Sequence, residues 1–212
     1  MTITPEIDQW LCSNYDYQCF VSWPHTIDPD ITACARTVAK VIKGKLAGSF
    51  SKPEVFLDES EMTAGDEWEK KIPHALCRSM SMVAICAPIY YHPKHHWCGL
   101  EWAVMESFSA ARFPGKDFRA IVPLMVRVSD PLPLAVSRID RFDISRITTQ
   151  GRRYFSYPEF LGTVEKIVAR VEQIAEELWR GNFKADCASV LVPKTSPFSD
   201  YHVPAQRYPL VG

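Results

Sequence analysis

Short apolar runs alternate with helix-length amphipathic patterns along most of this 212-residue chain, and this alternation constrains the fold more than any other feature. The apolar runs predict buried strands at residues 18–23, 55–57, 82–87 and 120–126, with a weaker strand around Phe142. Helical patterns separate the strands at about residues 31–47, 68–79, 97–112 and 160–178. Alternation of this kind predicts an α/β fold, in which helices cover both faces of a parallel sheet.

Local signals suggest where the helices begin and end. Asp30 is the expected N-cap of the helix that follows it. Pro73 should kink its helix or mark where the regular part begins. The last helix should stop at Gly181, because glycine is favoured just beyond a helix end. We expect residues 1–14 to be a lead-in, 15–181 one domain and 182–212 a tail rich in proline and aromatic residues. The aromatic residues favour a tail that packs on the surface of the domain over a flexible one.

Composition limits the classes of partner. Apolar residues make up 47% and charged residues 23% of the chain, and the net charge is −1 without a long basic run. Neither nucleic acid nor an anionic membrane is therefore an expected partner. The first thirty residues lack a basic segment followed by an apolar core, so we expect no signal peptide. No apolar stretch reaches the roughly 20 residues that span a bilayer. The seven scattered cysteines predict free thiols and a cytoplasmic location.

The segment from Trp97 to Glu101 is the strongest local candidate for a functional site. It places a carboxylate in the first turn of the helix that follows a central strand, where open α/β sheets bind ligands. Trp97 and Glu101 are four residues apart and so share a helix face. A structural role is the alternative, since the helix dipole favours a first-turn glutamate by about 0.3–1 kcal/mol.

Four motifs occur in a fixed order, and together they resemble the Toll/interleukin-1 receptor (TIR) domain of the bacterial, anti-phage (Thoeris-like) type. The resemblance covers about residues 15 to 178. The motifs are Tyr15–Trp23, Phe56–Leu57–Asp58 with the loop to Asp66, Ala75–Ser79, and Trp97–Glu101. The resemblance implies a flavodoxin-like fold with a central five-stranded parallel sheet.

Active members of that family cleave the nicotinamide–ribose bond of NAD+, and the resemblance implies the same substrate here without a cofactor or a metal. Glu101 would be the catalytic carboxylate. The products would be ADP-ribose, a cyclic ADP-ribose isomer or an ADP-ribosyl conjugate, made as a defence signal or through NAD depletion. The substrate-binding residues would be Ser22, Trp23, Asp58, Tyr90 and Trp97.

The resemblance also implies partners. The acidic loop from Asp58 to Asp66 would mediate TIR–TIR self-association and gate the site. This loop departs from the family pattern, because Leu57 and Ala64 stand where arginine and proline are usual. The chain carries no recognisable sensor domain, so a separate sensor or effector protein is a further expected partner.

Other readings of the same residues are weaker. His92, His95, His96 and Cys98 suggest zinc, but the separated second ligand pair of a closed site is absent from the sequence. Cys98 as a nucleophile lacks a visible third partner. Asp58 as the phosphoacceptor of a receiver domain lacks the expected lysine near residues 126–128.

Two other functions compete with NAD cleavage. A non-enzymatic TIR–TIR adaptor would have no need of the Glu101 carboxylate. A nucleoside deoxyribosyltransferase-like enzyme also breaks N-glycosidic bonds on a related fold, but the match at residues 20–23 favours the TIR domain.

Overall fold

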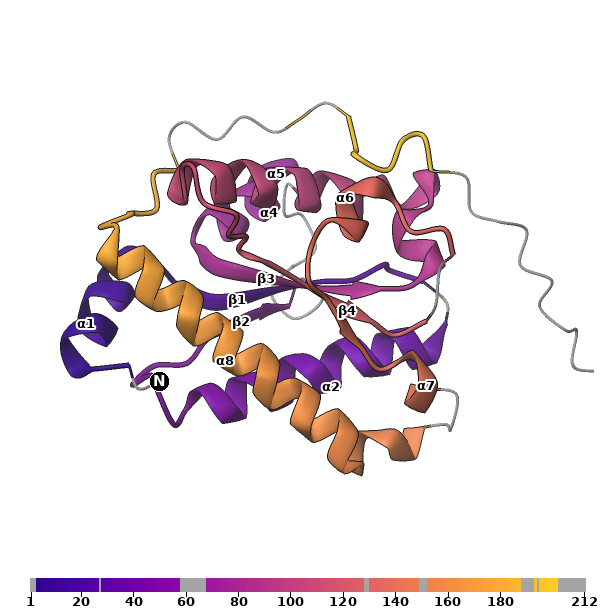
Figure 1. Cartoon of the computed structure of the whole chain (residues 1–212), viewed down its shortest axis with the longest axis horizontal. Coiled ribbons are helices and arrows are strands. Elements are labelled where there is room, and N and C mark those ends of the chain that lie inside the picture. The colour runs from indigo at the N-terminus through magenta and orange to yellow at the C-terminus, as the bar shows by residue number, and fades with distance from the viewer. Residues whose placement is uncertain are drawn as a thin grey trace, which may run out of the picture.

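Five parallel strands form the centre of the molecule, as the sequence predicts (Figure 1). The computed structural model describes residues 3–26, 28–57, 68–127, 130–148, 152–187, 193 and 195–201. The strands lie in the order β2-β1-β3-β4-β5, which is the order of a flavodoxin-like sheet. Their bounds are β1 Tyr17–Ser22, β2 Val55–Leu57, β3 Ser79–Cys86, β4 Ile121–Met125 and β5 Phe142–Asp143.

Helices cover both faces of the sheet (Figure 1). On one face lie α4 (Trp68–Cys77) and α5 (His96–Arg112), which pack against each other. On the other face α2 (Pro29–Leu46) packs against α8 (Pro158–Arg180), and α1 (Pro5–Asn14) packs beside α8. The shorter helices are η1 Pro88–Tyr91, η2 Pro93–His95, α6 Leu134–Ser137, α7 Ser145–Thr148 and η3 Arg152–Ser156.

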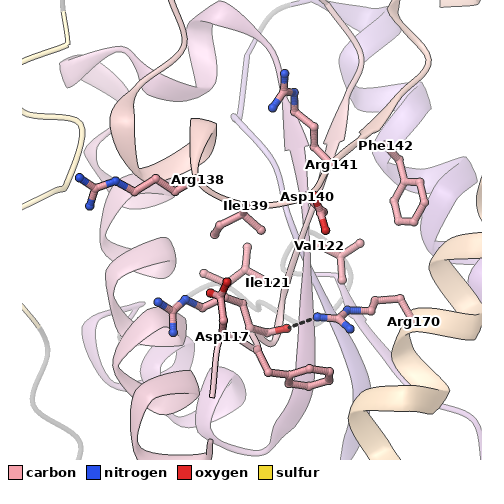
Figure 2. A pocket seen from close by; sticks show the side chains of 11 residues that line it. Asp117, Ile121, Val122, Arg138, Ile139, Asp140, Arg141, Phe142 and Arg170 are labelled. Atoms are coloured by element: carbon pink, nitrogen blue, oxygen red, sulfur yellow. Dashed lines mark hydrogen bonds between the residues drawn. The ribbon is translucent and has the colours of Figure 1, made fainter. Parts of the chain in front are cut away.

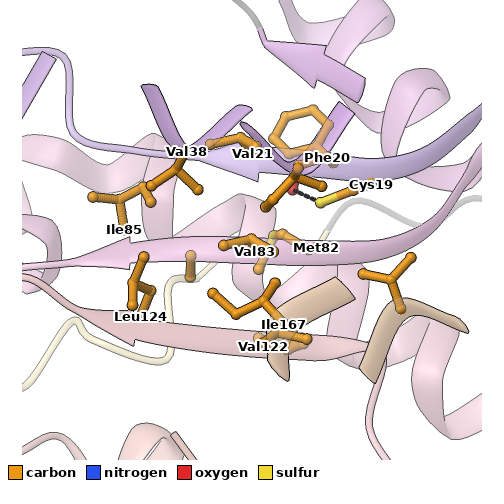
Figure 3. Packing of buried hydrophobic residues seen from close by; sticks show 14 of the residues in the cluster. Cys19, Phe20, Val21, Val38, Met82, Val83, Ile85, Val122, Leu124 and Ile167 are labelled. Atoms are coloured by element: carbon orange, nitrogen blue, oxygen red, sulfur yellow. Dashed lines mark hydrogen bonds between the residues drawn. The ribbon is translucent and has the colours of Figure 1, made fainter. Parts of the chain in front are cut away.

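The core fills the space between the sheet and its helices (Figure 3). β3 is buried along its whole length, as expected for the middle strand of a sheet covered on both faces. Val83 of β3, Val38 of α2 and Ile167 of α8 are all 0% exposed. Complete burial of one such side chain stabilises the fold by about 1.5–3 kcal/mol relative to its exposure.

Helix ends differ in detail from the sequence-based expectations. The N-cap of α2 is Asp28 rather than Asp30, and its carboxylate accepts a hydrogen bond from the Asp30 amide at 3.0 Å. α8 does stop before Gly181, but the left-handed residue is Asn182, with φ of 50°. Asparagine is the second choice for that position. The expected lead-in contains a helix, α1, which begins with Pro5 in its first turn.

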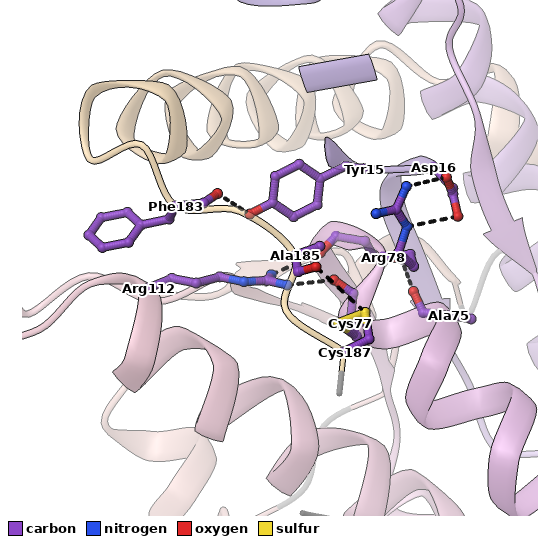
Figure 4. Close-up of a disulfide and its surroundings, with 10 residues drawn as sticks. Tyr15, Asp16, Ala75, Cys77, Arg78, Arg112, Phe183, Ala185 and Cys187 are labelled. Atoms are coloured by element: carbon purple, nitrogen blue, oxygen red, sulfur yellow. Dashed lines mark hydrogen bonds and ion pairs between the residues drawn. A yellow bond between two sulfur atoms is a disulfide. The ribbon is translucent and has the colours of Figure 1, made fainter. Parts of the chain in front are cut away.

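Arg112 ties the end of α5 to the junction between α4 and β3 (Figure 4). Its two terminal nitrogens donate to the carbonyl oxygens of Ser79 at 2.9 Å and Cys77 at 2.6 Å. Its guanidinium also lies over the rings of Tyr15 and Phe108, at 5.1 and 4.9 Å. Burial lowers the pKa of Arg112, but a guanidinium still stays charged at neutral pH, so these contacts compensate for lost water.

A disulfide joins Cys77, at the end of α4, to Cys187 beyond α8, with their Cα atoms 5.7 Å apart (Figure 4). The prediction that all the cysteines are free is therefore wrong for this pair. Spacing alone does not reveal such a pairing, because the two residues are 110 positions apart. Cys12, Cys19, Cys34, Cys86 and Cys98 are free thiols. The cytoplasmic location stays a prediction that the cysteines no longer support.

The helices of the described residues include none with the length and apolar character needed to cross a membrane.

We expect Cys187→Ser to lower the free energy of unfolding by about 2–4 kcal/mol, because it removes a constraint on the unfolded chain. Urea denaturation followed by circular dichroism, with and without a thiol reductant, measures this loss. Cys12→Ser is the matched control, since Cys12 is a free and exposed thiol. Equal unfolding midpoints for the oxidised and reduced wild-type protein would contradict the prediction.

Candidate active site

Ser22, Tyr90 and Glu101 meet at the carboxyl end of β1. Ser22 is the last residue of β1 and is 1% exposed. Tyr90 lies in η1, directly after β3, and Glu101 lies in α5. Because β1 and β3 are parallel neighbours, their carboxyl ends reach the same edge of the sheet. The fold thus gathers three polar side chains from distant parts of the sequence at the edge where α/β sheets bind ligands.

Two hydrogen bonds connect the three side chains. The Ser22 hydroxyl donates to Glu101 Oε2 at 2.5 Å, and the hydroxyls of Ser22 and Tyr90 are 2.7 Å apart. Since the only hydrogen of the Ser22 hydroxyl goes to Glu101, its oxygen accepts from Tyr90. The bonds therefore point from Tyr90 through Ser22 to the carboxylate. Such a chain polarises its members and strengthens the last bond.

Burial keeps the Tyr90 hydroxyl protonated and able to donate. Desolvation raises the pKa of Tyr90 well above its ordinary value, and neighbouring Cys98, Cys86 and Glu101 raise it further. The hydrogen bond with Ser22 acts in the opposite direction but does not dominate. Tyr90 is 0% exposed, so its hydroxyl positions Ser22 rather than facing an open pocket.

Glu101 lies in the second turn of α5, because the helix begins at His96 rather than Trp97. The expectation of a first-turn carboxylate is therefore wrong, and the first turn of α5 contains no acidic residue. The helix dipole acts mainly on the first turn, so it does not explain this glutamate. Glu101 is also only 4% exposed. A buried carboxylate is costly unless it is hydrogen-bonded, and Ser22 supplies such a bond.

The two tryptophans predicted to bind the substrate follow β1 and begin α5. Trp23, which follows β1, is 4% exposed and stacks on His25 with ring centroids 4.3 Å apart. Trp97 is half-buried at the start of α5, and its ring lies 5.0 Å from that of His96. Asp58 and the acidic loop from 58 to 66 lie outside the described residues.

Phe198 of the C-terminal segment, residues 195–201, packs against Tyr90, one of the three polar residues. It is 2% exposed, and its ring centroid lies 6.1 Å from Tyr90, 5.1 Å from Tyr91 and 5.5 Å from Trp102. Through Phe198, residues 195–201 of the tail pack against the domain. The sequence hinted at this role through its aromatic residues but did not identify the partners of Phe198.

Gly99 lets this segment approach α5. A Cβ atom at Gly99 would lie 1.8 Å from Ser196 Oγ, which no side chain can tolerate without movement of the segment. The glycine between Trp97 and Glu101 thus has a packing reason, because the C-terminal segment crosses the helix at that point.

The histidine and cysteine residues near α5 do not assemble a metal centre. Across the described residues there is no group of three or more His, Cys, Asp or Glu side chains placed to hold a metal ion. Cys98 is 3% exposed, and the Tyr90 hydroxyl lies 3.5 Å from its carbonyl oxygen. Burial and the nearby His92 and His25 lower the pKa of His95, which favours its neutral form.

Comparison with known protein families identifies the domain type. A family model described as a TIR domain matches residues 35–154, which is more than half of the chain. This region contains Tyr90, the segment from Trp97 to Glu101, and β2 to β5. No curated protein matches the sequence.

We expect Phe198→Ala to lower the free energy of unfolding by about 3–5 kcal/mol, because it leaves a cavity beside Tyr90 and Trp102. Thermal and urea unfolding measure the change. The control is Leu134→Ala, which truncates a side chain that is 63% exposed and should change stability by no more than about 0.5 kcal/mol. Similar small effects of both substitutions would show that the C-terminal segment does not pack in solution as described.

Proposed function

Because this chain belongs to the TIR-domain family, we propose that it is an enzyme that cleaves the nicotinamide–ribose bond of NAD+, with Glu101 as its catalytic residue. The observation that carries the proposal is the buried Glu101 carboxylate, held by the hydroxyl of Ser22 and, through it, by that of Tyr90. The family includes both NAD-cleaving enzymes and adaptors, so the choice depends on this arrangement.

One carboxylate is sufficient for the proposed chemistry. The nicotinamide of NAD+ already carries a positive charge, so it leaves as a neutral molecule and needs no general acid. When the bond between the nicotinamide nitrogen and C1′ of the ribose breaks, both electrons leave with nicotinamide and the ribose becomes oxocarbenium-like. A fixed carboxylate stabilises that positive charge. Water then bonds to C1′ through its oxygen and loses a proton to the solvent, or another nucleophilic acceptor bonds to C1′ in its place.

Ser22 and Tyr90 act as positioning residues in this proposal. Their hydroxyls hold the carboxylate in place before the substrate arrives, which limits reorganisation during bond cleavage. The 4% exposure of Glu101 means that the developing charge would sit largely out of water. Electrostatic attraction is stronger in such a site than in bulk solvent. Trp23 and Trp97 would supply the aromatic surfaces beside the substrate.

The same arrangement disfavours the adaptor alternative. A buried ionisable group costs free energy that an apolar side chain of similar size would not, so burial of one at a ligand-binding edge is characteristic of functional sites. An adaptor that works through surface contacts gains nothing from it. TIR domains commonly self-associate, and we propose that assembly of this chain accompanies its activity and that the products serve as a defence signal or deplete NAD+.

Glu101→Gln should reduce NAD+ cleavage by at least about 10³-fold, since it removes the charge and keeps the shape of the side chain. Nicotinamide release is measured by chromatography and mass spectrometry with concentrated or crowded protein. The control is Glu106→Gln on the same helix, which should leave the rate nearly unchanged. Full activity of Glu101→Gln would mean that another residue is catalytic. Survival of NAD+ in every assembly state of the wild-type protein would contradict the enzyme proposal.

Tyr90→Phe should lower kcat about 10-fold and leave KM nearly unchanged, because it removes one hydrogen bond behind the carboxylate and no contact with the substrate. Ser22→Ala, which removes the direct bond to Glu101, should lower kcat further. Steady-state kinetics for the two variants, with unfolding midpoints as a check on the fold, measure these effects. A rise in KM at constant kcat would instead place these hydroxyls against the substrate.

A further inference from the structure

A cavity of about 420 Å³ lies beside the amino-terminal part of β4 (Figure 2). The short strand β5 pairs only with Leu124 and Met125 of β4. Within the part of the chain that the structure describes, no strand therefore lies beside Ile121 and Val122 on that side, and these two residues line the cavity. Side chains between α6 and β5 and from α8 complete its wall.

A second cavity of about 530 Å³ adjoins the first. The two share Asp117, Arg119, Arg138 and Ile139, and the second extends toward Leu134 and Pro197. We call the two together the Arg138 groove. Each volume falls within the range of about 300–1,000 Å³ that is usual for sites that bind small molecules. Glu101, Ser22 and Tyr90 do not line either cavity, so the groove is separate from the candidate active site.

One cation of the groove is fixed in place. Arg170 of α8 donates from Nη1 to Gln173 Oε1 at 2.6 Å. Its Nη2 donates to the Arg119 carbonyl oxygen at 3.4 Å (Figure 2). Its guanidinium also stacks over the ring of Phe118, with 4.0 Å between Cζ and the ring centroid. These contacts hold a positive charge at the wall before any ligand binds, which reduces the entropy lost on binding.

Three more arginine residues line the groove. Among the described residues, the side chains of Arg119, Arg138 and Arg141 form no hydrogen bond and no ion pair. Asp117 and Asp140 also line the first cavity, and among the described residues neither forms an ion pair with Arg119, Arg138 or Arg141, although Asp140 interacts electrostatically with Arg170. The first cavity has four cations against two carboxylates, and Glu106 adds one carboxylate in the second cavity. The groove as a whole keeps a positive potential, which attracts anions.

The lining favours one chemical class of ligand. Guanidinium groups bind phosphate through paired hydrogen bonds. Ile121, Val122 and Ile139 provide an apolar floor for a ring, and the carboxylates of Asp117 and Asp140 can accept hydrogen bonds from hydroxyl or amino groups. A molecule with all three features carries a phosphate, a sugar and a base.

We propose that the Arg138 groove binds a nucleoside phosphate at a second site, distinct from the Glu101 site. The ligand's phosphate contacts the arginines, and its base lies on the apolar floor. The proposal does not depend on NAD+ cleavage, because its test is a binding measurement. Arg119 and Arg138 line both cavities, so the phosphate would bind where the two cavities meet, beside these two arginines.

Isothermal titration of the full chain with AMP and with adenosine tests the proposal. We expect AMP to bind at least 10-fold more tightly than adenosine, because charge-assisted hydrogen bonds to phosphate distinguish them. Arg138→Gln should weaken AMP binding about 10-fold, and Arg138→Lys should have an intermediate effect, since lysine keeps the charge but loses the paired geometry. Inorganic phosphate should compete with AMP.

Arg180→Gln is the matched control. It removes the same charge from the surface of α8, where Arg180 pairs with Glu176 and Glu177 outside the groove, and it should leave AMP binding unchanged. Unfolding midpoints establish that each variant is folded. The proposal is overturned if AMP does not bind, if adenosine binds equally well, or if Arg138→Gln has no larger effect than Arg180→Gln.

Discussion

The parallel pairing of β1 with β3 is the constraint on which the rest of the structure depends. It aligns Ser22 of β1 with Ala84 of β3, so that both strands end at the same edge of the sheet. The chain leaves β1 toward α2 and leaves β3 toward α5, and the polar side chains after each strand meet there. Parallel strands need crossover connections, and these connections supply the helices that bury both faces of the sheet.

The candidate active site lowers the stability of the fold locally, because it buries the ionisable side chain of Glu101. Burying the Glu101 carboxylate to 4% exposure costs free energy of desolvation, and the hydrogen bond from the Ser22 hydroxyl offsets some of this cost. Proteins tend to break the rules of packing at functional sites and compensate elsewhere. Here the favourable free energy comes from the apolar core that surrounds the sheet, whose middle strand β3 is buried along its whole length.

The C-terminal segment extends the structure beyond the region that matches the family model. A disulfide joins Cys187 to Cys77 at the end of α4, and Phe198 packs against Tyr90 and Trp102. The close approach of Ser196 to Gly99 links the segment to the motif that first indicated a functional site. Residues outside the matched region thus support the geometry of residues inside it.

The sequence by itself determined the alternating strands and helices, the α/β class and the motif that contains Glu101, because hydrophobic periodicity and short motifs are local properties of the chain. Tertiary structure alone decided that Cys77 bonds Cys187, that Ser22 and Tyr90 hold Glu101, and that the arginines between β4 and α8 surround one groove. These features join residues far apart in the sequence. Their distances follow from strand order and helix packing, which no local pattern encodes.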